Sequence, residues 1–206
     1  MKRIIAIALT MITLVFLMTG VCFAETESLG RLYDEYGVLS ADEYNTVLEA
    51  LNVVSDRFQV DTSIAVVNSI AADGYDDITA YADDLFDYYG YGTGENKDGI
   101  LLVVAMEERK WALSTHGLAI QYVTDKGNEY LQEQFLPYLS DGDYAKAFLA
   151  YAKGCDYLYA ERTGQKPSDY FNQSDSYDGD QNFYDEDYDS YEPVSVGRRL
   201  EITARY

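Results

Sequence analysis

The sequence predicts an α/β sandwich, in which helices cover the faces of a β-sheet. Strand-like and helix-like segments alternate along the chain, as they do in folds of this class. Residues 100–105 form the most apolar stretch after the N-terminal segment and predict a buried central strand. The chain has 206 residues and is 48% hydrophobic, which suits one domain with a real core and some appended segments.

The first predicted helix begins at a capping box. Ser40 and Glu43 are three positions apart and can each satisfy a free backbone amide of the other. Apolar residues then follow at spacings of three and four, namely Tyr44, Val47, Leu48, Leu51 and Val54. Residues 60–67 are rich in β-branched side chains and predict a strand. A second helix is predicted to begin at the Asp76–Asp77 pair, whose side chains can cap it.

The second half of the domain predicts a hairpin and two more helices. After the strand at 100–105 comes a polar turn at 107–110, and then an alternation of Trp111, Leu113 and Thr115. Helical apolar stripes are present over about 125–139 and 143–162. Together these elements predict a sheet with helices packed on its faces.

Residues 1–24 predict a secretory signal peptide. Two basic residues precede a long apolar run, and small residues at Cys22 and Ala24 provide a cleavage site. The alternative is an uncleaved membrane helix, because the apolar run could nearly span a bilayer. With cleavage, Cys155 remains alone, and its helical context favours a core thiol over a nucleophile. We therefore expect export, either to the extracellular space or to the outer face of the cell membrane.

The last forty or so residues differ in composition from the rest. Between positions 168 and 192 there are nine carboxylates and five tyrosines, with no Lys or Arg and no regular period. This composition is typical of disordered, low-complexity chain. The predicted organisation is therefore a domain over residues 25–164, followed by an acidic, Tyr-rich tail over residues 165–206.

The charge of the chain excludes some functions. Asp and Glu number 36 against 15 Lys and Arg, giving a formal net charge of -21. A surface that neutralises nucleic-acid phosphates requires the opposite balance, so no nucleic-acid partner is expected. The single His excludes metal sites built from several imidazoles.

Three sequence blocks occur in order over about residues 29–163. They are 34–40 (DEYGVLS), 81–86 (YADDLF), and a longer block made of 97–104 (KDGILLVV), Arg109, Ser114, Thr115, Gly117, Thr124 and Asp125. Together they resemble the TPM-domain family, which includes thylakoid-lumen proteins linked to photosystem II repair and exported or membrane-tethered bacterial proteins. The resemblance implies an α/β/α sandwich with a small mixed sheet flanked by helices.

The resemblance implies two possible functions. Some family members are acid phosphatases or calcium binders, and others are accessory factors of membrane complexes. We expect an accessory or interaction module at the cell envelope, with an unidentified envelope or membrane protein as its partner. The alternative is a divalent-cation-dependent acid phosphatase acting on phosphate esters. Bacterial relatives often carry a transmembrane helix after the acidic tail, whereas here a membrane tether is expected only if the N-terminal segment stays uncleaved.

Asp34, Asp98 and Asp125 are the candidate metal ligands. Each lies at a predicted element boundary, and loops at the end of a sheet converge, so the three carboxylates could hold Ca²⁺ or Mg²⁺. Such an ion could polarise a phosphate ester. Local roles are the alternative: Asp125 could cap its helix and Asp34 could fix a turn.

Other features count against an enzyme. His116 could act as a general acid or base, but no Ser or Cys stands in a nucleophile pattern, so a packing role is favoured. The glycine loop at 90–94 comes after a helix and before a strand, the reverse of a phosphate-binding loop. Three departures from the family pattern, at Lys97, Ala119 and Gln121, also weaken a metal-phosphatase assignment.

Overall fold

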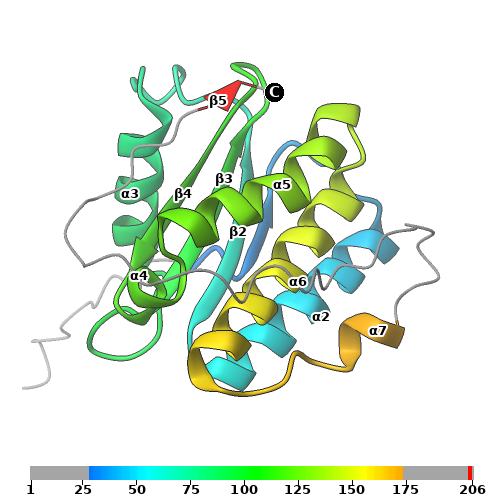
Figure 1. The fold of residues 1–206 in the computed structure, drawn as a ribbon. Coiled ribbons are helices and arrows are strands. Elements are labelled where there is room, and N and C mark those ends of the chain that lie inside the picture. Colours follow the sequence, from blue (N-terminus) through cyan, green and yellow to red (C-terminus); the bar gives the residue numbers. More distant parts are fainter. Residues whose placement is uncertain (1–27, 174–203, 206) are drawn as a thin grey trace, which may run out of the picture.

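The computed structural model describes residues 28–173 and 204–205, and their strands form one five-stranded sheet in the order β1-β2-β3-β4-β5 (Figure 1). The first three strands are parallel to one another, and β4 and β5 each run antiparallel to the strand before them in the sheet. Their bounds are β1 Leu32–Asp34, β2 Asp61–Val67, β3 Gly99–Ala105, β4 Lys110–His116 and β5 Ala204–Arg205. The predicted small mixed sheet is confirmed.

Helices cover this sheet unequally. Their bounds are α2 Ala41–Phe58, α3 Ile78–Tyr89, α4 Leu118–Tyr122, α5 Asp125–Asp141, α6 Tyr144–Thr163 and α7 Tyr170–Gln173. The three long helices α2, α5 and α6 lie on one side of the sheet, and α3 lies on the other side (Figure 1). The structure therefore confirms the predicted α/β/α sandwich, with a thick layer on one face and a single long helix on the other.

The core consists of two parts separated by the sheet. All seven residues of β3 are buried, because this strand lies inside the sheet and is covered on both faces. Side chains of β3 alternate between the two parts: Ile100, Leu102 and Val104 belong to the larger core, and Leu101, Val103 and Ala105 to the smaller one. The larger core also holds the fully buried ring of Trp111, the single tryptophan of the chain.

The starts of α2 and α3 follow the predicted capping residues. The Ser40 hydroxyl accepts a hydrogen bond from the Glu43 amide, and the Glu43 carboxylate accepts one from the Ser40 amide at 2.8 Å. This reciprocal pair is the predicted capping box. At the start of α3, the Asp77 side chain accepts a hydrogen bond from the Thr79 amide at 2.8 Å. Of the two predicted capping residues, Asp77 is therefore the one that caps the helix.

The sequence pattern does not predict β1 or α4, since three and five residues are too few to show a period. Strand β1 lies at the edge of the sheet and pairs with β2. From α2, the Tyr44 hydroxyl donates a hydrogen bond to the carbonyl of Leu32 at 2.7 Å. A helix side chain is thereby attached to the backbone of the edge strand.

The folded part of the chain extends beyond the predicted domain end at residue 164. Gly164 is the C-cap of α6, and the chain then turns back onto the domain. The Ser168 amide donates to the Asp156 carboxylate at 2.7 Å, and Phe171 of α7 is 2% exposed within the larger core. Residues 165–172 therefore fold back onto the domain, unlike the predicted tail, and Tyr170 and Phe171 make the contact with the larger core.

The predicted signal peptide and the acidic run from 174 onward, apart from β5, lie outside the described residues. Within the described ranges, none of the helices combines the length and the apolar character that crossing a bilayer requires.

Candidate functional site

Asp34 fixes the loop that leads from β1 into α2. Its Oδ1 accepts hydrogen bonds from the amides of Gly37 at 2.9 Å and Val38 at 3.1 Å, and its Oδ2 accepts from the Leu39 amide at 3.0 Å. Both carboxylate oxygens are thus engaged with backbone donors of one turn. This is the local role that the sequence left open for Asp34.

Asp98 lies at the other end of the sheet from Asp34. It directly precedes β3, whereas Asp34 is the last residue of β1, and the two strands run in the same direction on either side of β2. Through β2 the register aligns Asp34 with Val104, near the far end of β3. The prediction that loops bring these two carboxylates together is wrong, because one follows a parallel strand and the other precedes one.

Asp125 is the first residue of α5 and does not cap it. The cap is Thr124, whose hydroxyl accepts from the Gly127 amide at 3.4 Å. This helix begins shortly after His116, which pairs with Gly99 at the Asp98 end of the sheet. Among residues 28–173, no group of three or more His, Cys, Asp or Glu side chains has an arrangement able to hold a metal ion.

Replacing Asp34 with alanine is expected to lower the free energy of unfolding by about 1–3 kcal/mol, because three backbone amides lose their acceptor. Urea unfolding followed by Trp111 fluorescence measures this change. Adding Ca²⁺ should stabilise the parent and the alanine variant equally. A calcium stabilisation present in the parent and lost in the variant would contradict a purely structural role for Asp34.

His116, Ser114 and Asp83 form a hydrogen-bonded group that differs from a catalytic triad. The Ser114 hydroxyl donates to Asp83 Oδ1 at 2.7 Å and lies 3.1 Å from His116 Nε2. In a triad the acid orients the histidine, whereas here the acid binds the serine hydroxyl directly. Ser114 is 1% exposed, and the His116 ring stacks on Phe86 with centroids 3.9 Å apart. The packing role predicted for His116 agrees with this arrangement.

The glycine loop is organised by Asp61, a residue that the sequence analysis did not single out. Its Oδ2 accepts from the Gly92 amide at 2.9 Å, and its Oδ1 accepts from Arg31 Nε at 3.1 Å and from the Ser63 hydroxyl at 3.0 Å. Gly92 has φ of +93°, and a Cβ there would lie 2.6 Å from the Lys97 backbone. The glycines therefore permit a tight turn, consistent with the sequence argument against a phosphate-binding loop. The sequence did offer one indication of this role, because Asp61 is an acidic residue at the first position of a buried strand.

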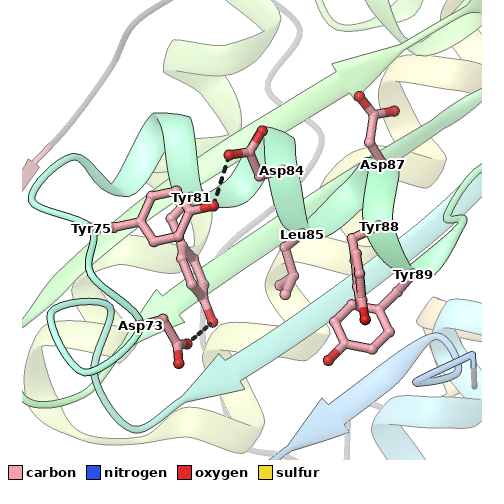
Figure 2. Close-up of a pocket in the computed structure, with 8 residues that line it drawn as sticks. All are labelled: Asp73, Tyr75, Tyr81, Asp84, Leu85, Asp87, Tyr88 and Tyr89. Atoms are coloured by element: carbon pink, nitrogen blue, oxygen red, sulfur yellow. Dashed lines mark hydrogen bonds between the residues drawn. The ribbon is translucent and has the colours of Figure 1, made fainter.

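A groove of about 600 Å³ lies along α3 and is shown in Figure 2. We call it the α3 groove. It is lined by four tyrosines, three aspartates and one leucine: Asp73, Tyr75, Tyr81, Asp84, Leu85, Asp87, Tyr88 and Tyr89. Most of these residues belong to α3, and two come from the loop that precedes it.

Two tyrosine–aspartate pairs fix the geometry at one end of the α3 groove (Figure 2). Tyr81 donates its hydroxyl hydrogen to Asp73 at 3.1 Å, and Tyr75 donates to Asp84 at 2.8 Å. Burial and the bond to Asp73 raise the pKa of Tyr81 above its usual range, and the bond to Asp84 raises the pKa of Tyr75. Both tyrosines therefore remain hydrogen-bond donors, and their rings pack edge to face with centroids 5.0 Å apart.

Tyr88 and Tyr89 form the other end of the α3 groove. Their rings meet edge to face with centroids 4.9 Å apart, and Tyr88 is 70% exposed. The aspartates and aromatic rings are suited to recognition, since no side chain in the groove is placed as a nucleophile with a base beside it. Nothing in the helical period of α3 indicates that Tyr75, Tyr88 and Tyr89 surround the same groove as Tyr81.

The comparison with family models decides the relationship of this chain to known proteins. The model described as the TPM domain matches residues 32–157, which is more than half of the chain. This chain belongs to the TPM-domain family. The match begins at β1 and ends inside α6, so this TPM domain contains the α3 groove and four strands of the sheet.

Solved structures with a similar fold come from several bacteria. The N-terminal domain of a P. gingivalis protein is 19% identical, with a TM-score of 0.57 over 67% of this chain and 87% of that one. The N-terminal domain of the cg2496 protein from Corynebacterium glutamicum is 19% identical, with a TM-score of 0.51 over 70% and 93% of the two chains. The BA42 protein from the psychrophilic bacterium Bizionia argentinensis is 14% identical, with a TM-score of 0.52 over 60% and 82%. These similarities establish the fold of the TPM domain. No curated protein matches the chain.

Proposed function

We propose that this TPM-domain protein is an exported accessory module that binds an envelope or membrane protein through its α3 groove. The observation that carries the proposal is the combination of four tyrosines and three carboxylates in one groove. Aromatic side chains are enriched at protein interfaces, where they provide contact area together with a polar group. The secretory pattern of residues 1–24 supports a place at the cell envelope.

The chemistry of the described residues favours binding over catalysis. Cys155 is fully buried, and burial raises the pKa of its thiol far above the usual range, so it is unsuited to act as a nucleophile. The Ser114 hydroxyl is buried and donates to Asp83. Asp34 and Asp98, proposed as ligands for a phosphatase metal, lie at opposite ends of the sheet. The phosphatase alternative therefore has less support than a binding role.

Hydrolysis of an aryl phosphate by the purified protein, with and without Ca²⁺ or Mg²⁺, tests the choice between these functions. We expect no metal-dependent turnover. The matched variants are Asp98→Asn and Asp125→Asn, which remove a negative charge while keeping the side-chain shape. Turnover that requires metal and disappears in both variants would overturn the binding proposal in favour of the phosphatase.

Site-specific crosslinking tests the binding surface itself. A photoreactive amino acid placed at Tyr88, in cells that carry the protein naturally, should give a discrete crosslinked product. The same amino acid at Glu133, an exposed residue of α5 on the other side of the sheet, is the matched control. The product at Tyr88 should weaken when Asp84 and Asp87 are changed to asparagine. Equal products at both positions, or none at either, would contradict the proposal.

A further inference from the structure

The α3 groove lies on the side of the sheet that carries one long helix. Helix α3 packs mainly on β3 and β4, and four partly buried side chains also pack against the smaller core: Leu29, Tyr33, Tyr75 and Tyr89. Two of these tyrosines line the groove. A bound chain segment alongside α3 would therefore lie next to aromatic rings that already contact the core on one side.

The charge of the α3 groove has one sign. Asp73, Asp84 and Asp87 line it, and none of the described lining residues is basic. Each of the first two aspartates accepts one tyrosine hydroxyl, and both are exposed. Their remaining hydrogen-bonding capacity is available to a further donor, because a carboxylate accepts several hydrogen bonds.

The chain itself places an ammonium group at this groove. Lys97, in the turn before β3, binds Asp87 with its Nζ 3.0 Å from Oδ1. The two side chains are 46% and 63% exposed, so the pair lies at the rim, in contact with water. This contact shows that a cationic side chain from outside α3 can reach the groove carboxylates.

From these observations we infer that the α3 groove binds an extended, arginine-bearing segment of a partner protein. A guanidinium group stacks on aromatic faces and donates paired hydrogen bonds to carboxylates, and the groove offers both types of group side by side. Lysine has the charge without the planar stacking surface, so a lysine segment should bind more weakly. The inference rests on the proposed binding function and specifies the chemistry of the partner.

The test uses three labelled ten-residue peptides and the purified protein. In the first peptide Arg alternates with Ser, in the second Glu replaces Arg, and in the third Lys replaces Arg; fluorescence anisotropy gives the dissociation constants. We expect the Arg peptide to bind and the Glu peptide not to bind. A peptide with Lys in place of Arg should bind about two- to five-fold more weakly than the Arg peptide.

The variants separate the groove from the overall negative charge. Changing Asp84 and Asp87 to asparagine should weaken binding of the Arg peptide about three- to ten-fold, and Tyr88→Ala about two- to five-fold. The matched control changes Glu129 and Glu133 of α5 to glutamine, which removes the same charge from the opposite side of the sheet. This control should change binding less than two-fold. Added salt should weaken binding to the parent more than binding to the asparagine variant.

Four results would overturn the inference. Equal losses of affinity for the Arg peptide in the Asp84/Asp87 variant and in the Glu129/Glu133 variant would show that the peptide is attracted by net charge alone. Unchanged binding in Tyr88→Ala, together with equal affinity for the Arg and Lys peptides, would exclude stacking. Arg198 and Arg199 are two adjacent basic residues that follow the acidic stretch in the sequence. A rise in affinity after changing both to glutamate would assign the groove to this segment of the chain itself. Crosslinking at Tyr88 without discrimination among the peptides would overturn the arginine assignment and leave the proposed binding function standing.

Discussion

Replacing Arg57 with alanine is expected to lower the free energy of unfolding by about 3–5 kcal/mol at pH 7.5. Arg57 Nη1 binds Asp156 Oδ1 at 2.8 Å, and the Asp156 side chain is 1% exposed. The same guanidinium donates to the Lys166 carbonyl and lies over the Phe58 ring, 4.7 Å from its centroid. Its removal leaves a buried carboxylate without a cation and releases the segment that follows α6.

The loss of unfolding free energy in Arg57→Ala should be smaller at acid pH. Burial raises the pKa of Asp156 even with Arg57 in place, although the bonds from Ser168 and Arg57 oppose the shift. Between the ordinary pKa and this raised pKa the folded state holds more protons than the unfolded state, so ionisation of Asp156 lowers stability as the pH rises through that window. Without Arg57 the pKa of Asp156 should rise further, so the pH range in which the folded protein holds the extra proton should extend to higher pH. Protonation then removes the uncompensated charge, so Arg57→Ala should differ less from the parent at pH 4.5 than at pH 7.5.

Urea unfolding at the two pH values, monitored by the single tryptophan, provides the measurement. The control is Lys146→Ala, which breaks the pair between Lys146 and Asp143 at 3.1 Å, whose side chains are 32% and 41% exposed. That exposed pair should contribute less than about 1 kcal/mol. A loss in Arg57→Ala no larger than in the control, or one that is independent of pH, would show that Asp156 does not depend on its cation.

Changing Gly117 to alanine should have the second large effect, a loss of about 3 kcal/mol. Gly117 has φ of +57°, and an added Cβ would lie 2.0 Å from Asp98 Oδ1 and 2.9 Å from the Asn96 carbonyl oxygen. Asp98 cannot retreat freely, because the same Oδ1 accepts from the Leu118 amide at 2.7 Å. Backbone strain and steric overlap therefore add together. For a chain of this size, the melting temperature should fall by roughly 6–12 °C.

Gly164→Ala is the matched control for this prediction. Its φ of 68° and ψ of 20° are the left-handed helical conformation, which costs alanine less than the φ of 57° and ψ of -126° at Gly117, and a Cβ there would meet nothing within 4 Å. We expect a loss of about 1 kcal/mol in this control. Calorimetry of both variants separates the ordinary cost of a left-handed glycine position from the added strain and overlap at Gly117. If Gly117→Ala melts no lower than Gly164→Ala, the close approach of Gly117 to Asp98 is not a constraint on the folded protein.

The elements of this fold that the sequence predicts are those with a local physical signature. The Ser40–Glu43 capping box and the fully apolar strand β3 are recognisable because the relevant interactions are made within a few residues. Residues 165–172 show the opposite case. Their order depends on Arg57, which is distant in the sequence, and on Asp156 of the preceding helix, so composition alone places them in the acidic tail.

The candidate site was harder to predict than the fold. Asp34 and Asp98 both lie at strand ends, but the sequence does not state which end of the sheet each occupies until strand direction is known. The α3 groove could not be predicted, because the sequence does not show which tyrosines are exposed in a groove and which are core residues. In a helical stripe, Tyr81 has the pattern of a core residue, and only the packed structure shows its hydroxyl directed to Asp73 in a groove.

The bond between Tyr44 and Leu32 bears on self-association. An edge strand exposes backbone groups that can pair with a strand of another copy and start aggregation. Arg31 and Glu35, which flank β1 on either side, bond to β2, so by alternation the carbonyl of Leu32 is directed away from β2. The Tyr44 hydroxyl occupies that acceptor. A tyrosine of the adjacent helix thus blocks one of the positions through which a second sheet could extend this one, a protection that many proteins obtain from charged residues on the strand.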